Sequence, residues 1–174
     1  INIIGNGVVL DPIIFREECE KLEAIGVPVR ERVVIAKKAH LILPTHRILD
    51  AASEAAKGKS KIGSTLKGIG PTYMDKTGRN GLRVGDTLSD NFVERYQTLK
   101  NKHIGLLKQY DFEYDPDQNE KEWMDAIEYM KSFNLVDGEY FANKKLKECS
   151  RILAEGAQGS MLDVDFGSYP FVTS

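Results

Sequence analysis

The chain has 174 residues, of which 41% are hydrophobic and 29% are charged. These proportions are typical of a soluble globular domain that can bury its own core. The net charge of −2 provides no basic field to attract nucleic acid. No apolar run approaches the roughly 20 residues that a membrane helix needs, and no signal peptide is visible. Cys19 and Cys149 are far apart and belong to no CxxC pair, so the composition favours a reducing, cytoplasmic setting without structural disulfides.

The first residues predict a strand followed by a helix. Residues 1–10 are apolar apart from Gly-Asn-Gly at 5–7, which predicts either two strands joined by a turn or one strand with a loop. Asp11 and Pro12 then fit the cap and first turn of a helix, and Gly26 fits its end. The apolar residues of this helix recur at helical spacing: Phe15, Cys19, Leu22 and Ile25.

Two more short strands and a second helix are expected next. Residues 32–36 and 41–43 are apolar and β-prone, and Thr45 fits the cap of a helix over 46–57. The following Gly-Lys-Ser at 58–60 imitates the end of a nucleotide-binding P-loop. The glycine required five positions earlier is Ser53, and the tripeptide follows a helix rather than a strand. A helix end that leads into a solvated turn is therefore the expected structure.

Residues 63–79 combine four glycines and a proline with hydroxyl and basic side chains. Because glycine and proline weaken regular elements, this segment predicts a loop rather than a helix or central strand. Its backbone N–H groups, hydroxyls and cations suit an anion, above all a phosphate.

Three helical blocks follow that loop. The first begins after Ser89 or Asp90 and places apolar and aromatic residues on one face. That face comprises Phe92, Val93, Tyr96, Leu99, His103, Leu106 and Tyr110. Such a face predicts packing in the core or at a subunit interface. Two further helices are expected over 120–133 and 139–149, so the fold class is α/β with a helix-rich middle.

The histidines give no sign of a metal site. His40, His46 and His103 lack metal-ligand spacing with one another or with the cysteines. His103 fits a core or interface histidine. Asp163 and Asp165 could form an acid–base pair, but nothing else in the chain points to a glycosidase.

The C-terminal segment predicts a second ligand-binding turn. A short strand over 151–155 would lead into Gly-Ala-Gln-Gly at 156–159. Ligands of open α/β sheets bind beyond the carboxyl ends of strands, and Gln158 could pair with a purine edge. These residues indicate a phosphate-bearing ligand, such as a nucleotide, shared by two loops. Two tight structural turns with no ligand are the alternative.

Two long motifs carry a family resemblance. Residues 68–79 read Gly-Ile-Gly-Pro-Thr-Tyr-Met-Asp-Lys-Thr-Gly-Arg. They resemble the adenylosuccinate synthetase pattern Gly-Ile-Gly-Pro-x-Tyr, two residues, Lys, two residues, Arg. Residues 155–174, which run from Glu-Gly-Ala-Gln-Gly through Tyr-Pro to Thr-Ser, resemble the second conserved stretch of that family. Residues 4–10 and 81–86 are similar as well, so the resemblance spans the chain.

The resemblance implies a function and residue roles. The family joins IMP and L-aspartate with GTP and magnesium: GTP phosphorylates the purine 6-oxygen, and the aspartate amine displaces that phosphate. Thr65 and Thr173 would contact IMP, chiefly its 5′-phosphate, and Gln158 would bind near the purine 6-position. Lys76 matches the active-site lysine. Arg79 matches an arginine that reaches the IMP phosphate of the partner in a homodimer.

The resemblance also implies that parts of the enzyme are missing from these residues. Ser64 replaces a usual threonine and keeps the hydroxyl, whereas Leu66 replaces a position that is more often glycine or basic. The phosphate loop, the general acid and base, the magnesium ligands and the guanine and aspartate sites cannot be located here. The expectation is a single fragment, 1–174, cut from the middle of a longer chain. It would be the central portion of a P-loop NTPase-like, mostly parallel sheet with a helix-rich insertion. Alternatively, the isolated piece is a non-catalytic IMP-binding or dimerisation module.

Overall fold

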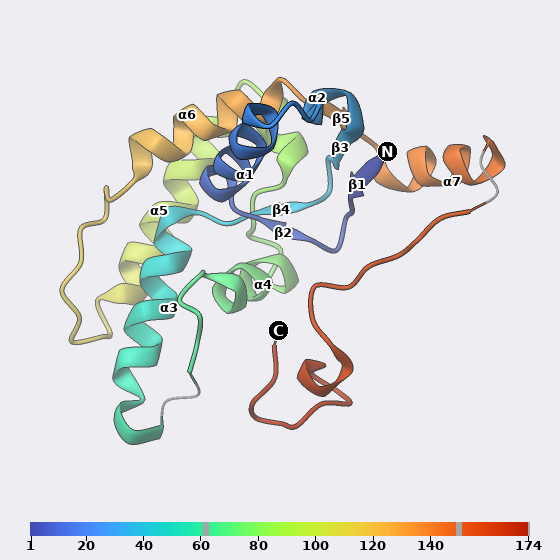
Figure 1. Cartoon of the computed structure of the whole chain (residues 1–174). Helices are drawn as coiled ribbons and strands as arrows, with labels where there is room; N and C mark the ends of the chain where they lie inside the picture. The colour runs from blue at the N-terminus through green and yellow to red at the C-terminus, as the bar shows by residue number, and fades with distance from the viewer. Residues whose placement is uncertain (61–62, 149–150, 174) are drawn as a thin grey trace.

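The computed structural model describes residues 1–60, 63–148 and 151–173 (Figure 1). Its main sheet has three parallel strands in the order β1-β3-β5. They are β1 (Asn2–Ile4), β3 (Val33–Ala36) and β5 (Asn134–Val136). Ile3 lies opposite Val34, and Ile35 lies opposite Leu135. Because all three strands run the same way, residues 5–7, 37–38 and 137–139 meet at the carboxyl edge of the sheet.

A second parallel pair extends the strand layer. β2 (Val9–Leu10) pairs with β4 (His40–Leu41), and His40 forms one antiparallel bridge with Arg83. The helices α3 to α6 all lie between β4 and β5 in the chain. The α/β class, the parallel pairing and the helix-rich middle predicted from the sequence are therefore confirmed.

The first helix, α1 (Pro12–Ala24), begins as predicted. The Asp11 side chain accepts hydrogen bonds from the backbone N–H groups of Ile13 and Ile14. The helix packs against α6, but Leu22 and Ile25 are exposed, so the buried face is narrower than the sequence indicated. A short helix, α2 (Val29–Arg32), was not expected.

The central helices form most of the remaining body (Figure 1). They are α3 (Pro44–Ala56), α5 (Phe92–Leu107) and α6 (Glu120–Lys131). The predicted Thr45 cap is wrong, because Leu43 takes that position and Pro44 fills the first turn. The residue that caps α5 is Asn91 instead of Ser89 or Asp90. After α3, Gly58–Ser60 forms a 3₁₀ turn, which agrees with the expected turn at the end of a helix.

The core confirms the aromatic face of α5. Tyr96 and Trp123 are fully buried and stack with ring centroids 5.0 Å apart. The indole N–H of Trp123 donates to the carbonyl of Ile42 at 2.8 Å, which joins α6 to the chain between β4 and α3. Val93 and Leu106 are exposed, in contrast to the prediction that they share this buried face.

The glycine-rich segment contains a helix, which corrects the expectation of a loop. Residues Ile69–Thr77 form α4. Pro71 lies in the first turn, where a missing N–H breaks no intrahelical hydrogen bond. Gly68, at a φ of +76°, supplies the left-handed residue before the helix, and Gly78 ends it. The glycines therefore flank the helix more than they interrupt it.

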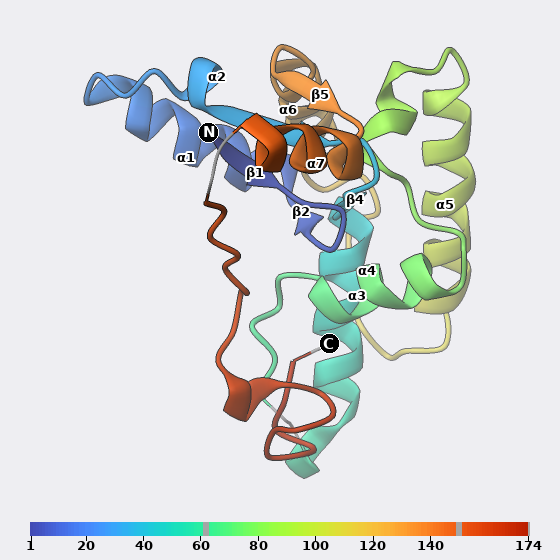
Figure 2. The same ribbon diagram turned by 90° about the vertical axis from the view of Figure 1, so that its right-hand side faces the viewer.

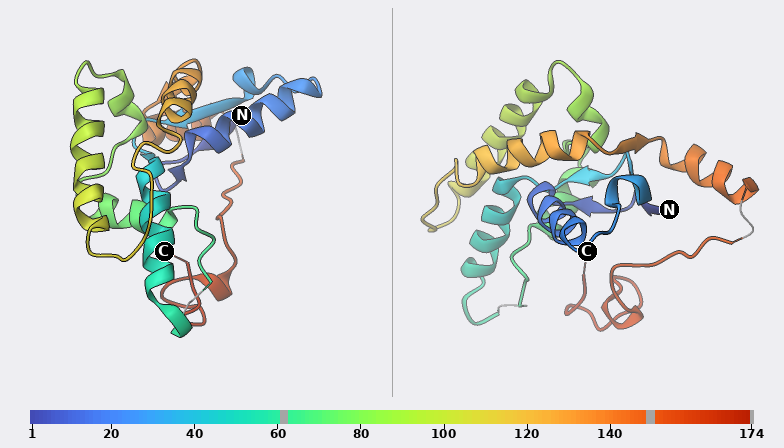
Figure 3. Two further views of the ribbon diagram at one scale, coloured as in Figure 1. Left: turned by 90° about the vertical axis from the view of Figure 1, so that its left-hand side faces the viewer. Right: turned by 45° about the horizontal axis from the view of Figure 1, so that its top comes forward.

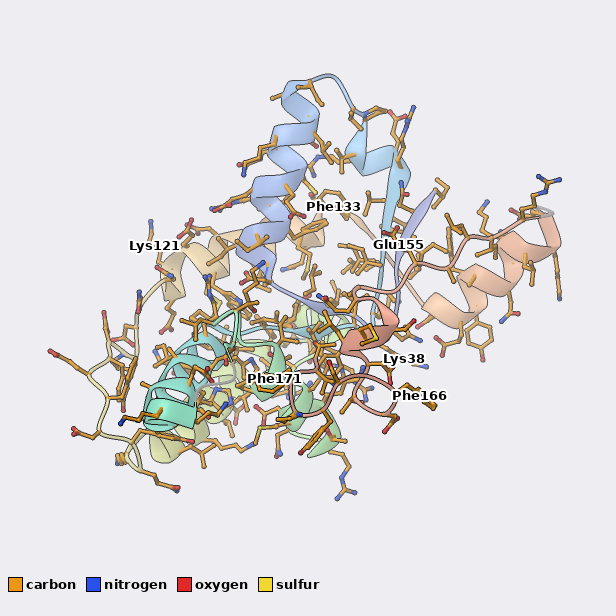
Figure 4. All side chains as sticks on the ribbon, turned by 60° about the horizontal axis from the view of Figure 1, so that its bottom comes forward. Lys38, Lys121, Phe133, Glu155, Phe166 and Phe171 are labelled. Carbon is orange, nitrogen blue, oxygen red and sulfur yellow. The ribbon has the colours of Figure 1, made fainter. Side chains whose placement is uncertain are left out.

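The C-terminal part runs away from the helical body. After α7 (Gly138–Glu148), the chain forms no strand over 151–155, so that prediction is wrong. A strand needs a hydrogen-bonded neighbour, and this segment has none among the described residues. It ends in a coil around a 3₁₀ turn, Ser160–Leu162, that curls below α4 (Figures 1 and 2). Phe166 on this coil is 89% exposed and points outward (Figure 4).

No helix in the described ranges is long and apolar enough to cross a membrane. The helix α7 projects from the side of the sheet opposite α3, as the right-hand view shows (Figure 3). Cys149, the predicted end of α7, lies outside the described residues, whereas Cys19 is a buried free thiol. Burial raises the pKa of the Cys19 thiol to about 11.

Candidate functional site

Lys76 lies at the carboxyl edge of the main sheet. Its Nζ donates to the backbone carbonyls of Asn6 and Gly7, both at 3.4 Å. Tyr73, one turn earlier on α4, donates its hydroxyl to the Gly7 carbonyl at 2.9 Å. The ammonium of Lys76 also lies 5.3 Å from the centre of the Tyr73 ring. Helix α4 thus presents a cation at the edge where ligands of α/β sheets bind.

Polar side chains from the neighbouring strands meet at the same edge. Asn6 donates its side-chain amide to Glu139 at 3.1 Å, and Lys38 forms an ion pair with the same carboxylate. The hydrogen bond from Lys38 lowers the pKa of Glu139 to about 2. Gly138 lies directly beneath Asn6, since a Cβ there would approach Asn6 Oδ1 to 2.9 Å. The ends of β1, β3 and β5 are therefore joined by charged and polar groups.

A buried carboxylate lies on another face of α4. Asp75 is only 4% exposed. Its Oδ2 atom is 3.0 Å from His46 Nε2 and 2.7 Å from His103 Nε2. Lys102 forms an ion pair with its Oδ1 atom. This cluster joins α3, α4 and α5.

The hydrogen bonds define the protonation of the cluster. The backbone N–H of Leu43 donates to His46 Nδ1 at 3.0 Å, so the proton of a neutral His46 is on Nε2 and faces Asp75. Burial lowers the pKa of His46 to about 4, which keeps the ring neutral near pH 7. Burial alone would raise the pKa of Asp75, but hydrogen bonds from His103, His46 and Lys102 together lower it.

His46, Asp75 and His103 bring three metal-ligand atoms within 4.8 Å of one another. A metal ligand must offer an unprotonated nitrogen, whereas His46 Nε2 carries the hydrogen that it donates to Asp75. The position of Asp75 Oδ1 beside Lys102 adds a competing positive charge. The arrangement therefore suits a hydrogen-bond network that connects helices better than it suits a cation.

Two carboxylates of α3 hold the loop that carries Thr65. Asp50 accepts hydrogen bonds from the Ser64 hydroxyl at 2.7 Å and from the Gly68 N–H at 2.9 Å. Glu54 accepts from the N–H groups of Gly63 at 2.7 Å and Ser64 at 3.3 Å. The sequence predicts that such N–H groups bind a ligand anion, but side chains of the same chain accept their hydrogen bonds. Thr65 itself is exposed on this loop.

The sequence matches the family model described as adenylosuccinate synthetase over residues 1–174. The chain belongs to the adenylosuccinate synthetase family. It is 62% identical to the adenylosuccinate synthetase of Bacteroides thetaiotaomicron and 63% identical to that of Phocaeicola vulgatus. Both alignments cover 100% of this chain and 41% of the relative, so the chain spans less than half the length of these curated relatives.

A solved structure supports the same family assignment. The fold resembles a fully ligated adenylosuccinate synthetase from Plasmodium falciparum with a TM-score of 0.84 and 35% sequence identity. The superposition covers 100% of this chain and 40% of that protein. The predicted family resemblance is therefore confirmed by sequence and by structure.

Within this member of the synthetase family, the predicted site residues do not all lie together. Arg79 directly follows α4 and is exposed, with a left-handed φ of +63°. Gln158 and Thr173 lie on the C-terminal coil, which makes hydrogen bonds only within itself in the part of the chain that is described. Thr173, for example, donates its N–H to the Leu162 carbonyl at 2.8 Å. The structure thus places Lys76 on α4 and Arg79 just after it, and leaves Gln158 and Thr173 on a separate segment.

Sequence reasoning missed the residues that hold this helix and its loop. Asp75 stands beside Lys76 in the family motif, but only the structure brings it to His46 and His103. Asp50 and Glu54 are spaced one helical turn apart just before the glycine-rich segment. That spacing is a signal that could have identified them, because i and i+4 side chains of a helix share one face.

Proposed function

We propose that this chain is the central part of an adenylosuccinate synthetase, a ligase that converts IMP, L-aspartate and GTP to adenylosuccinate, GDP and phosphate. The observation that carries this proposal is the match to the synthetase family along all 174 residues. The exposed apolar side chains of Leu153, Phe166 and Tyr169 also support a larger protein, since surfaces of this kind are usually covered. The proposed location is the cytoplasm, with neither nucleic acid nor membrane as a partner.

Within that enzyme, the chain would supply most of the IMP site. Thr65 and Thr173 bind IMP, chiefly at its 5′-phosphate, and Gln158 binds near the purine 6-position. Lys76 acts at the reaction centre. Two observations support these roles. Thr65 is exposed on a loop whose backbone is bound by side chains of α3, and Lys76 lies at the carboxyl edge of the sheet.

Arg79 would serve the partner subunit of a homodimer. Its side chain is exposed at the end of α4, so it is available to a second molecule. A planar guanidinium can bind two phosphate oxygens at once, which suits the IMP phosphate.

GTP and Mg²⁺ would bind mainly through residues outside this chain. GTP supplies the phosphoryl group that activates the purine 6-oxygen. Of the described residues, the cluster of His46, Asp75 and His103 is a poor candidate for the cation, because the imidazole N–H of His46 points at the carboxylate.

An activity assay tests this proposal. The complete protein that contains this chain is incubated with IMP, L-aspartate, GTP and magnesium, and adenylosuccinate is measured by absorbance and mass spectrometry. We expect product in the full mixture and none when any one substrate is omitted. A folded complete protein that forms no adenylosuccinate would overturn the proposed activity.

The second candidate function is a non-catalytic IMP-binding or dimerisation fragment. It concerns the 174-residue piece alone, because the chain spans only 41% of its curated relatives. IMP is titrated into the isolated chain while its melting temperature and its elution from a sizing column are recorded. An IMP-dependent rise in melting temperature or a dimeric peak would support this role. A monomer that does not respond to IMP would exclude it.

A further inference from the structure

We infer that Asp75 is a positioning residue for Lys76: its buried carboxylate fixes α4 so that the ammonium of Lys76 stays at the carboxyl edge of the sheet. The inference rests on the proposed role of Lys76 in the ligase reaction. It assigns Asp75 no contact with substrate.

Few side chains of α4 are buried. The helix has nine residues, and an isolated helix of that length is marginal in water. Its buried residues are Thr72 and Asp75, both polar. Thr72 bonds only to the carbonyl of Gly68, at the start of the same helix. Asp75 is thus the buried side chain of α4 that hydrogen-bonds to the neighbouring helices.

The two histidine rings that Asp75 binds are held rigidly. The rings of His46 and His103 are 0% and 1% exposed, and their centroids lie 4.5 Å apart. Each ring is fixed at its other nitrogen: His46 Nδ1 by the Leu43 N–H, and His103 Nδ1 by the Thr45 hydroxyl at 2.6 Å. Asp75 thus binds two preoriented donors on α3 and α5, and side chains oriented in this way hold a site most accurately.

The hydrogen bonds of Lys76 itself are weak. Both hydrogen bonds from Lys76 Nζ are 3.4 Å long, near the limit for such a bond. Consecutive residues of a helix point about 100° apart, so rotation of α4 about its axis would carry Lys76 away from Asn6 and Gly7. The hydrogen bonds of Lys76 are weak against such a rotation, so the resistance comes from the Asp75 cluster together with the Tyr73 hydroxyl, which donates to the Gly7 carbonyl at 2.9 Å.

A double-mutant cycle separates positioning from general stabilisation. We compare wild type, Asp75→Asn, Lys76→Ala and the double variant in the complete enzyme, at saturating substrates, with product counted by mass spectrometry so that slow variants stay measurable. Asp75→Asn should lower kcat by about a hundredfold, the loss expected for a displacement of about 1 Å. In the Lys76→Ala background, Asp75→Asn should lower kcat further by less than about twofold, because the effects of residues that act as a unit are not additive.

The controls distinguish the possible failures. Asp117→Asn removes a 74% exposed carboxylate that pairs with Lys100 of α5 without touching α4, and should keep the wild-type rate. If Asp75→Asn does not fold, Lys102→Met removes the half-exposed partner of Asp75 instead, and its smaller loss should likewise vanish in the Lys76→Ala background.

Equal losses from Asp75→Asn in both backgrounds, or no loss at all, would overturn the inference while the ligase assignment stands. A wild-type rate in Lys76→Ala would remove the role of Lys76 and the inference with it. Absence of product from the wild-type enzyme would instead contradict the proposed function.

Discussion

Asp50 and Glu54 lie one turn apart on α3, and both accept hydrogen bonds from the loop that carries Thr65. Hydrogen bonds, chiefly from Lys57 and next from the Gly63 N–H, lower the pKa of Glu54 to about 2, so its carboxylate is charged near pH 7. Charge-assisted hydrogen bonds of this kind are stronger than neutral ones. The loop therefore has a defined shape because two side chains of the neighbouring helix hold its backbone.

Removal of one carboxylate should release this loop. Asp50→Ala leaves the Gly68 N–H and the Ser64 hydroxyl without their partner, at a cost of about 1–3 kcal/mol in the free energy of unfolding. Amide hydrogen exchange across 64–68 should accelerate, whereas Asp90→Ala, at an exposed position outside the loop, should leave it unchanged. Unaltered exchange in Asp50→Ala would show that other contacts hold the loop.

His46 should make stability depend on pH. Its pKa is about 4 in the folded protein, because of burial, against an ordinary value of 6.5. Between these values the unfolded chain binds more protons, so the free energy of unfolding falls as the pH drops from 6.5 to 4. The loss attributable to His46 reaches about 3 kcal/mol at the lower end. Urea unfolding of wild type and His46→Gln across this range measures it, and equal slopes would contradict it.

At the scale of elements, α4 shows how flanking residues permit a helix in a glycine-rich sequence. Gly68 combines a left-handed backbone with close packing, since a Cβ there would lie 2.9 Å from the Arg47 backbone nitrogen. Its carbonyl accepts the Thr72 N–H at 3.1 Å, the first hydrogen bond of the helix. The start of α4 thus requires glycine for two independent reasons.

Alanine should have opposite effects at two helix-associated glycines. Gly68→Ala adds backbone strain and a close contact, and should lower the free energy of unfolding by about 1–3 kcal/mol. Gly105 lies in α5 with no atom within 4 Å of an added Cβ, so Gly105→Ala should raise it by about 0.5–1 kcal/mol. Urea unfolding of both variants tests this contrast, which a shift in the same direction would refute.

At the scale of the whole molecule, hydrophobic periodicity predicted most of the fold. The strands β1 to β4 and the helices α1, α3, α5, α6 and α7 lie close to where the pattern placed them, whereas the short strand β5 was not predicted. Helix α4 was missed because glycine content was weighed without regard to position, although Gly68 and Gly78 flank the helix. The strand over 151–155 was predicted from local composition, which contains no information about a neighbouring strand to pair with.

The candidate site was predictable only where the chain is continuous. Lys76 and Arg79 fall within the family motif of residues 68–79, and Thr65 lies just before it, so the sequence alone proposes them as site residues. Asp75 hydrogen-bonds to His46 and His103, which are distant from it in sequence and follow no ligand-spacing rule. Such a network becomes visible only when three helices are packed together, so sequence reasoning assigned His103 to the core without finding its carboxylate.

We propose that this chain provides the IMP site of an adenylosuccinate synthetase. The most direct test is the KM for IMP of the complete enzyme with Arg79→Ala, beside Arg32→Ala as an exposed arginine outside the site. A charged hydrogen bond contributes about 1.5–3 kcal/mol, so Arg79→Ala should raise the KM for IMP by about tenfold to a hundredfold in a folded protein. An unchanged KM for IMP in Arg79→Ala would contradict the account.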